Sequence, residues 1–371
     1  MNIALLGFGT VGKAFYELAQ GRSDLRVTTV LSRHDRPELR CRVTSDFDEI
    51  ARDRSIDTVV EVMGGLEPAY RYICMALRAG KHVVTANKQL MCAHYDELLA
   101  LTRECGTALR CTAAAGGGIP WLTSLSRAGR LDKLTAVEGI LNGTTNYMLS
   151  AMTAADVDYT TCLREAQALG YAEADPTADV EGYDARRKLV LSANLAFGAS
   201  VREEDIPCFG ISSVTAADFA AWREAGLVCK LFVRAEEHDG RVAAFVCPTL
   251  FPAASPVAQT NGTGNLVSLY GERFGCLSFS GAGAGGYPTG SSVLSDCVDI
   301  AEGARGFYVP RGEAKPIDNS AAVYRFYLRI GAKGAYTAPM PVSKAFEQVR
   351  AAKARGENVF LARIQEETAH A

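Results

Sequence analysis

The chain begins with the stretch NIALLGFGTVG (residues 2–12), in which an apolar run leads into three glycines. Residues 2–6 predict a strand, and residues 11–20 predict a helix. Between them, the first glycine permits a tight turn, the second lets the backbone approach a pyrophosphate, and the third lets helix and strand pack closely. Because a helix N-terminus attracts negative charge, we expect a dinucleotide to bind here. The residues expected to hold it are Gly7, Phe8, Gly9, Thr10, Val11 and Gly12.

Strands and helices continue to alternate as far as about residue 130. Further strands are expected at 25–31, 58–63, 82–86 and 108–112, with helical segments between them. Such alternation predicts right-handed crossovers and a parallel sheet that is covered on both faces. We therefore predict an α/β fold in which residues 1–130 form a Rossmann-type, doubly wound domain.

The pattern changes beyond residue 130. Residues 131–289 predict an α+β domain with a mostly antiparallel sheet, which we expect to bind substrate and to form the dimer. One of its helices is expected over 178–197. Its clearest hairpin pairs residues 230–235 with 242–247 around an Asp-Gly turn. A helix at 290–303 is expected to pack back on the first domain. Residues 306–371 predict a small α/β tail of strand, helix and strand.

Composition sets the broad class of the protein. A net charge of −3 over 371 residues gives no hint of binding to nucleic acid or to an anionic membrane. No apolar run approaches the roughly 18–20 residues that a membrane-spanning helix needs. The eleven cysteines occur singly, without a Cys-x-x-Cys pair, which argues against a zinc or dithiol site. We expect reduced cysteines in a cytoplasmic protein that acts on small molecules.

The end of the second strand bears on the choice of cofactor. An acidic residue there would bind the ribose hydroxyls of NAD, but the chain has Ser-Arg-His-Asp-Arg at positions 32–36. Arg33 can pair with a 2′-phosphate, which favours NADP, while Asp35 keeps NAD as an alternative. The remaining interpretation is a solvated charged loop.

A second informative segment is AQALGYAEADPTADVEGYDARRK (residues 166–188). Asp184 and Lys188 are four residues apart and would share a helix face, although exposed pairs of this kind are common and contribute little. Gly182 is expected inside the helix, at a cost of about 1 kcal/mol relative to alanine, so something should pack closely there. Nearby acids exceed what the cations need, which suits a substrate with an ammonium group; they are Glu173, Asp175, Asp179 and Glu181.

This segment resembles the homoserine dehydrogenase signature, A-x3-GYA-x2-DP-x2-DV-x-G-x-D-x3-K, at every position. Other family-like segments occur in the expected order, namely VEVMGG (60–65), HVVTANK (82–88), GGIP (117–120), GILNGTTNY (139–147) and GAGAG (281–285). The resemblance covers about residues 1–305. It implies a reversible, NAD(P)-dependent interconversion of L-homoserine and L-aspartate 4-semialdehyde in threonine, methionine and isoleucine biosynthesis.

The resemblance implies a role for several residues. Lys188 would be the general acid, a role that lysine fills when burial and neighbours tune it. Lys88 is the second candidate, for orienting the substrate or contacting the nicotinamide ribose. The substrate would be held by Glu173 and Asp184, with support from Asp179 and Asp175. Thr144 is either a substrate contact or a helix cap. Residues that match positions near the cofactor are Thr85, Asn87, Lys88, Gly170 and Gly285.

Two parts of the chain depart from the family pattern. Many relatives have a glutamate that helps to bind a structural monovalent cation, and this chain has Thr112 there. A sodium ion would then depend on backbone carbonyls, those of Ala115, Gly117 and Ile119. Residues 306–371 resemble a truncated, degenerate ACT module, which we expect to serve packing or oligomerisation more than threonine sensing. Relatives associate through the sheet of the second domain, so we expect a homodimer or higher homo-oligomer, and a monofunctional enzyme because no kinase domain precedes it.

Two other functions fit parts of the pattern. One is another amino-acid dehydrogenase of the same fold, acting for example on saccharopine or aspartate, against which the complete match over 166–188 argues. The other is a non-catalytic, NADP-binding sensor, which would not need the proton donors Lys88 and Lys188 together with Glu173 and Asp184. The sequence leaves open how the two lysines divide their work.

Overall fold

The computed structural model describes residues 1–155, 157–307, 309–310 and 313–366. The chain divides into two compact units. Unit 1 comprises Met1–Arg127 and Ala282–Val309, and unit 2 comprises Ala128–Gly281 and the residues from Pro310 onward. One unit has a parallel sheet and the other a mostly antiparallel one, which confirms the predicted α/β class. None of the described helices is long and apolar enough to cross a membrane.

Unit 1 is built on a six-stranded parallel sheet with the order β3-β2-β1-β4-β5-β6. The strands are β1 (Asn2–Leu6), β2 (Arg26–Leu31), β3 (Arg42–Thr44), β4 (Thr58–Glu61), β5 (His82–Thr85) and β6 (Leu109–Arg110). The chain runs outward from β1 to β3 and then returns to β4 on the other side of β1. The carboxyl ends of β1 and β4 therefore form the switch point at which sheets of this kind bind nucleotides.

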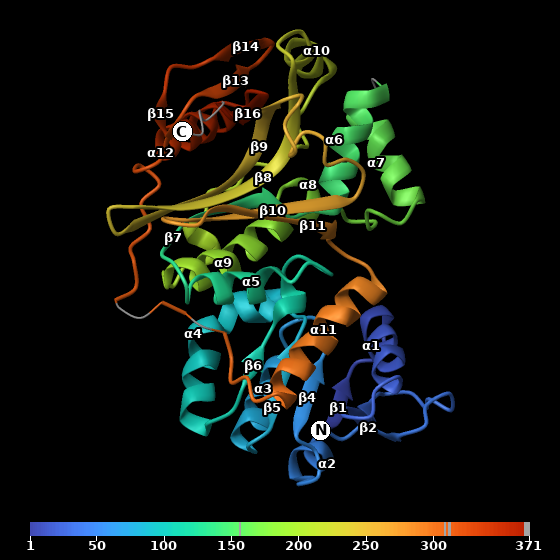
Figure 1. The fold of residues 1–371 in the computed structure, drawn as a ribbon. Coiled ribbons are helices and arrows are strands. Elements are labelled where there is room, and N and C mark those ends of the chain that lie inside the picture. The colour runs from blue at the N-terminus through green and yellow to red at the C-terminus, as the bar shows by residue number, and fades with distance from the viewer. Residues whose placement is uncertain (156, 308, 311–312, 367–371) are drawn as a thin grey trace. The chain divides into compact units, whose positions relative to one another are not determined.

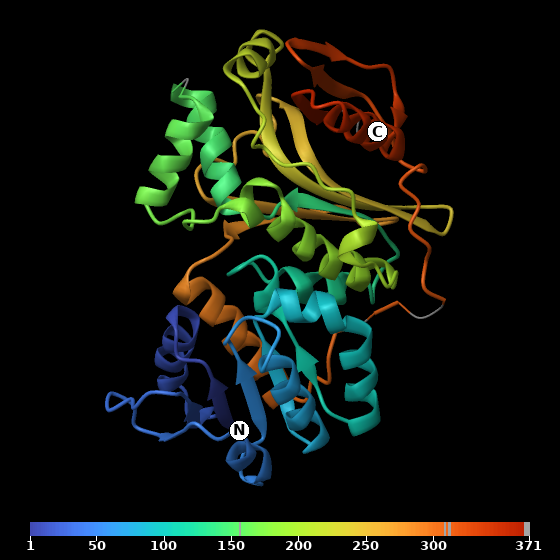
Figure 2. The same ribbon diagram turned by 180° about the vertical axis from the view of Figure 1, so that it is seen from behind.

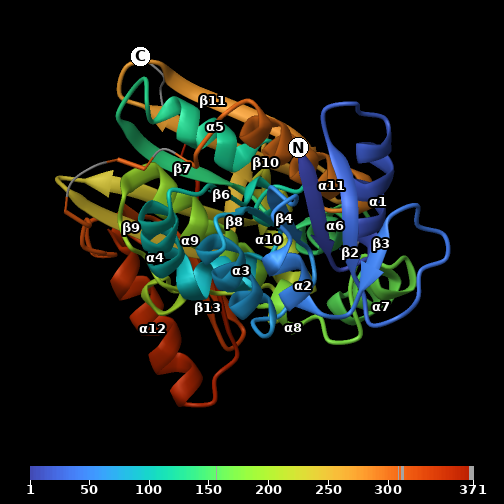
Figure 3. The ribbon, with the colours of Figure 1, turned by 90° about the horizontal axis from the view of Figure 1, so that it is seen from below.

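Helices cover both faces of this sheet. α1 (Thr10–Gln20) and α11 (Gly286–Ala301) pack together on one face, and α3 (Ala69–Arg78) and α4 (Lys88–Cys105) pack together on the other (Figures 1 and 3). A glycine lets the first pair approach closely, since a Cβ on Gly290 would lie 3.0 Å from Phe15 N. The shorter helices are α2 (Phe47–Arg52), η1 (Thr112–Ala114) and α5 (Trp121–Ala128).

Unit 2 contains an eight-stranded sheet with the order β11-β10-β7-β8-β9-β16-β13-β14. Its strands from the middle of the chain are β7 (Leu134–Ile140), β8 (Leu227–His238), β9 (Arg241–Pro252), β10 (Gly264–Gly271) and β11 (Gly275–Ala282). β8 and β9 are the hairpin expected from the sequence. They turn at Asp239 and Gly240, whose φ angles of 48° and 80° are those that an Asp-Gly hairpin turn requires.

Helices lie against both faces of this second sheet. α9 (Tyr183–Phe197) packs on β7, β8 and β9, as Figure 2 shows, and α6 (Gly143–Ala155) packs on β8 and β10. On β8, Leu231 faces the start of α9 and Lys230 bonds to Ser150 of α6. Because neighbouring residues of a strand point to opposite sides, these two helices cover opposite faces. The other helices are α7 (Tyr159–Ala168), α8 (Thr177–Val180), η2 (Glu203–Asp205), α10 (Ala216–Glu224) and α12 (Val342–Ala354).

The single helix expected over 178–197 is two helices, α8 and α9. Gly182 separates them with a φ of 81°, a left-handed conformation that disfavours other residues. A Cβ at this position would lie 2.9 Å from Cys208 Sγ. The expectation that Gly182 lies inside a helix was therefore wrong, whereas the close packing inferred from it is present.

The residues from Pro310 onward group with unit 2 and extend its sheet. β16 (Val359–Ile364) pairs in parallel with β9, and β13 (Phe326–Ile330) pairs antiparallel with β16. To the strand, helix and strand expected here, the structure adds β14 (Lys333–Tyr336) and the short pair β12 (Val323–Tyr324) and β15 (Met340–Pro341). The tail thus completes a sheet that begins in the middle of the chain.

Candidate active site

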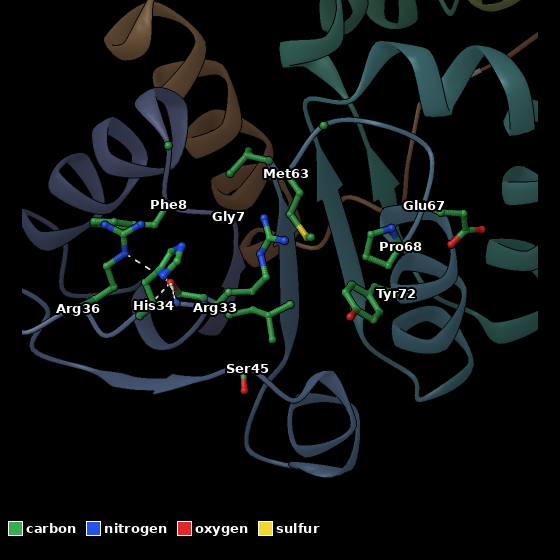
Figure 4. A pocket seen from close by; sticks show the side chains of 15 residues that line it. Gly7, Phe8, Arg33, His34, Arg36, Ser45, Met63, Glu67, Pro68 and Tyr72 are labelled. Atoms are coloured by element: carbon green, nitrogen blue, oxygen red, sulfur yellow. Dashed lines mark hydrogen bonds between the residues drawn. The ribbon is translucent and has the colours of Figure 1, made fainter.

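The glycine turn after β1 forms part of the wall of a pocket of about 580 Å³ in unit 1 (Figure 4). Two of its glycines are required by close packing: a Cβ on Gly12 would lie 2.3 Å from Gly7 O, and one on Gly7 would lie 2.9 Å from Val62 O. At Gly9, by contrast, no described atom lies within 4 Å of such a Cβ, and no side chain caps the helix that follows. The backbone N–H groups at the start of α1 are therefore open to a phosphate.

Basic side chains from the loop after β2 line the same pocket. Arg33, His34 and Arg36 are among its lining residues, and Figure 4 shows them gathered beside Phe8. The guanidinium carbon of Arg36 lies 5.5 Å from the centre of the Phe8 ring. Asp35 is exposed and does not belong to the lining. This end of the pocket therefore favours an anionic group.

The other residues expected at the cofactor lie mostly at the carboxyl edge of the same sheet. Thr85 is buried at the end of β5 and Asn87 is buried just after it, and Lys88 begins α4, which the side chain of Asn87 caps. Gly285 precedes α11 with a φ of 118°. Gly170 follows α7 in unit 2 with a φ of 75°. Apart from Gly170, these residues belong to unit 1.

A cluster of charged side chains lies in unit 2, where the start of α9 meets the end of β7. Lys188 is 8% exposed and Asp184 is 7% exposed. Lys188 Nζ lies 2.8 Å from Asp184 Oδ2 and donates to the carbonyl of Leu141 at 2.6 Å. An ammonium carries three N–H groups, and among the described residues these are its two acceptors. One N–H of Lys188 is therefore available to an oxygen of a ligand.

Asn142 joins the two carboxylates of this cluster. Its Nδ2 donates to Asp179 Oδ1 at 2.7 Å and to Asp184 Oδ2 at 2.9 Å. Its Oδ1 accepts from Thr145 N at 2.9 Å and so caps α6. Burial raises the pKa of the Asp179 carboxyl, and the bond from Asn142 opposes that rise. Two carboxylates thus lie beside the Lys188 ammonium, an arrangement that suits a substrate ammonium group.

Thr144 lies beside this cluster. Its Oγ1 donates to the Tyr171 carbonyl at 2.5 Å. The capping role considered for Thr144 belongs to Asn142. Sequence reasoning had a local signal for Asn142, which stands between a strand and a helix, but no signal for its carboxylate partners.

Two of the residues expected to bind substrate lie outside these contacts. Glu173 and Asp175 are both exposed. Asp175 Oδ1 accepts from Thr177 N at 3.1 Å. Hydrogen bonds from the Thr177 side chain and from this backbone N–H lower the pKa of Asp175. The structure thus brings Asp179 and Lys188 into one cluster and leaves Glu173 and Asp175 on the segment between α7 and α8.

The carbonyls expected to hold a cation follow η1, at Ala115, Gly117 and Ile119. Two of them accept bonds within the protein: Gly117 O from Ser292 Oγ at 2.6 Å and Ile119 O from Trp121 N at 2.7 Å. Among the described residues, no three His, Cys, Asp or Glu side chains are grouped to bind a metal. Because a carbonyl oxygen has two lone pairs, these bonds leave one on each of the two oxygens.

The chain matches two family models. Residues 7–111 match the model described as homoserine dehydrogenase, NAD binding domain. Residues 120–298 match the model described as homoserine dehydrogenase. The first range contains the pocket of unit 1, and the second contains the charged cluster of unit 2.

Known homoserine dehydrogenases are similar to most of the chain. The protein from Synechocystis sp. is 42% identical over 316 residues, which are 81% of this chain and 73% of the relative. The crystal structure of a homoserine dehydrogenase from Thiobacillus denitrificans is 30% identical with a TM-score of 0.89, over 99% of this chain and 98% of that one. A hyperthermophilic archaeal homoserine dehydrogenase in complex with NADPH shares the fold, with 23% identity and a TM-score of 0.69 over 80% of this chain and 96% of that one.

Proposed function

This chain belongs to the homoserine dehydrogenase family, and we propose that Lys188 is the proton donor of its reaction. The protein is an oxidoreductase with a nicotinamide-binding domain. The family interconverts L-aspartate 4-semialdehyde and L-homoserine in the biosynthesis of threonine, methionine and isoleucine. The bound nicotinamide supplies the hydride. The protein itself must hold the amino acid and supply a proton to the developing alkoxide. The matches give no support to a different amino-acid dehydrogenase or to a non-catalytic sensor.

The observation that carries this proposal is the unused N–H of a buried ammonium. The Leu141 carbonyl and Asp184 fix the position of Lys188 Nζ, and the third N–H is left for the aldehyde oxygen. As the carbon is reduced, this N–H bond breaks and the O–H bond of homoserine forms. Lys188 then regains its proton from solvent, and the reverse reaction uses the same path in the opposite direction.

For the substrate ammonium group, we propose the carboxylates of Asp184 and Asp179, together with Glu173. The position of the first two beside Lys188 supports this role, and the exposed carboxylate of Glu173 is accessible to a ligand. Asp175 and Thr144 would support the segment that carries them. For Lys88, at the start of α4, we propose a contact with the nicotinamide ribose or with the substrate.

For the cofactor, we propose NADP ahead of NAD. Arg33 and Arg36 line the pocket, and guanidinium groups bind phosphate with charge-assisted bonds. The archaeal homoserine dehydrogenase of the same fold is in complex with NADPH. We expect Arg33→Ala and Arg36→Ala each to lower kcat/KM with NADPH by about tenfold, the loss of one such bond, and to leave NADH nearly unaffected. Equal losses with both dinucleotides would contradict the preference.

We propose a homodimer or higher homo-oligomer in the cytoplasm. β11 is an edge strand of the unit 2 sheet and is exposed along most of its length, and exposed edges favour pairing with a second chain. A monomer mass by light scattering at micromolar concentration would contradict this.

All eleven cysteines are unpaired, as expected in a reducing compartment. For the tail, residues 306–371, we propose a role in packing rather than in threonine sensing. Strong inhibition of the enzyme by added threonine would refute this proposal.

The decisive experiment follows NADPH absorbance with L-aspartate 4-semialdehyde. We expect turnover by the wild type and a loss of about 10³-fold in Lys188→Ala, within the range for general acids. Lys344→Ala, which removes an exposed lysine of α12, is the control and should match the wild type. A wild type without turnover would refute the function. Unchanged turnover in Lys188→Ala would mean that another residue donates the proton. Lys88 would then be the next candidate, tested with Lys88→Ala.

A further inference from the structure

A buried carboxylate, Glu61, ends β4 at the edge of the sheet where the pocket lies. It is 0% exposed, and its neighbours across the sheet are Leu6 of β1 and Thr85 of β5. Among the described residues, no cation forms an ion pair with it, and the groups that donate to it are all neutral. Isolated buried charge is costly, and an apolar side chain would pack here without that cost.

One oxygen of Glu61 holds the turn after β4. Oε1 accepts from Met63 N at 2.7 Å and from Gly64 N at 3.2 Å. Both of these residues line the pocket. Gly7 of the phosphate-binding turn packs against the same segment, since a Cβ on it would lie 2.9 Å from Val62 O and 3.1 Å from Met63 Cα. Glu61 therefore sets the position of the wall on which the phosphate-binding turn rests.

The other oxygen of Glu61 holds the loop after β5. Oε2 accepts from Thr85 Oγ1 at 2.6 Å, and Thr85 Oγ1 in turn accepts from Asn87 N at 3.0 Å. Asn87 Nδ2 donates to Gly65 O at 2.6 Å, which returns to the turn after β4. Asn87 also caps α4, whose first residue is Lys88. One carboxylate thus connects the pocket wall to the start of the helix that carries Lys88.

We infer that Glu61 is a positioning residue, which holds the cofactor-binding turns and Lys88 in register with each other; this inference rests on the proposed function. An ionised carboxylate has two accepting oxygens and no donor, which matches loops that both present donors. An amide in its place would turn an N–H toward one of the two loops. Burial raises the pKa of Glu61, while the bonds from Thr85 and Met63 favour its charged form.

The test is the affinity of Glu61→Gln for the dinucleotide, measured by the fluorescence of bound NADPH, or of NADH if the wild type binds it more tightly. We expect the Kd to rise on the order of ten- to a hundredfold, because small displacements of positioned groups have effects of this size. The KM for the dinucleotide should rise more than the KM for the semialdehyde. The matched control is Asp296→Asn, another fully buried carboxylate of unit 1, bonded to Thr112 and Arg110. It should lower the melting temperature and leave the Kd unchanged.

A folded Glu61→Gln protein with wild-type affinity would overturn the inference, as would a Kd that rises equally in Asp296→Asn. If Glu61→Gln does not fold, Thr85→Val and Thr85→Ser replace it. Valine removes the hydroxyl that joins Glu61 to Asn87 at nearly constant size, and serine keeps it. Weaker binding in the valine variant that serine restores would support the inference, and equal affinities would overturn it. A wild type that binds neither dinucleotide would instead refute the proposed function.

Discussion

Unit 2 contains two buried ion pairs of the same length in different surroundings. The Lys188–Asp184 and Arg329–Asp218 pairs both have an N–O distance of 2.8 Å. None of the four residues is more than 8% exposed. Distance and burial alone therefore do not separate the pair proposed to react from a structural one.

The Arg329 pair is held by many groups of the protein. Asp218 accepts bonds from Thr215 N and Oγ1 and from Tyr327 OH, in addition to Arg329 Nε. The other nitrogens of Arg329 donate to the carbonyls of Ser213 and Gly331 and to the side chain of Asn358. These bonds connect the start of α10 with β13 and with the residue before β16, so the pair acts as a clamp on the tail.

The Lys188 pair has fewer partners within the protein and a second carboxylate beside it. Its ammonium has two acceptors among the described residues, which leaves one N–H for a ligand. Asp179, whose pKa is raised by burial, adds a second carboxylate to the cluster. The second carboxylate and the small number of protein groups that hold the cation, rather than burial, thus distinguish the pair proposed to react from the Arg329 pair.

The same isosteric change at both aspartates would test this distinction, and the larger effect is expected at the Lys188 pair. Asp184→Asn removes the charge that holds the Lys188 ammonium, so we expect kcat/KM to fall about 10³-fold, or about 4 kcal/mol of transition-state stabilisation. Thermal unfolding should show a folded protein, since Asn142 and Leu141 remain in place. Activity within tenfold of the wild type would mean that Lys188 does not depend on its partner.

Asp218→Asn should have the opposite profile. Breaking a buried pair leaves the Arg329 guanidinium without its counter-charge, so we expect the free energy of unfolding in urea to fall by about 3 kcal/mol. The kcat/KM per folded molecule should stay near that of the wild type, because protein groups already accept bonds from four of the five N–H groups of Arg329. A loss of activity without a loss of stability would remove the distinction between the pairs.

The two pairs also show what sequence reasoning could reach. Asp184 and Lys188 lie on one helix, four residues apart, so local periodicity predicted their contact. Asp218 and Arg329 are 111 residues apart and meet because β13 joins the sheet through β16. The glycine turn and the parallel sheet were predictable for the same local reason, whereas Gly182 takes its conformation beside Cys208, which no helical pattern encodes.

Asn142→Ala would test whether charge balance sets the working range of the Lys188 cluster. Because the bond from Asn142 stabilises the charged form of Asp179, its loss should raise the pKa of Asp179 further. Protonation then removes a negative charge at a higher pH, so the acid limb of the kcat/KM profile should move upward in pH. We expect a loss on the order of ten- to a hundredfold near neutral pH.

The control for this variant is Asn194→Ala on the same helix, α9. Asn194 is also buried, and it bonds to the N–H and the carbonyl of Val201. Its removal should lower stability by about 1–3 kcal/mol through the unpaired groups that remain, with an unshifted pH profile. Equal shifts in both variants would show that the profile responds to the packing of α9 and not to Asp179.

The smallest effect is expected at a third ion pair, which involves α9 but not Lys188. It tests whether a change near the start of α9 affects activity without altering the Lys188 pair. Arg186 and Arg187 lie 3.2 Å and 2.9 Å from Glu203, and their side chains are 22% and 25% exposed. Partly exposed pairs contribute about 1 kcal/mol or less, so Glu203→Gln should change the free energy of unfolding by at most that amount and leave kcat/KM unchanged. Arg187 is the residue next to Lys188, and any general sensitivity of this helix segment would appear in this variant. A tenfold loss of activity would mean that the placement of α9, rather than the unused N–H of Lys188, limits the reaction. Wild-type activity would assign the effect of Asp184→Asn to the Lys188 pair itself.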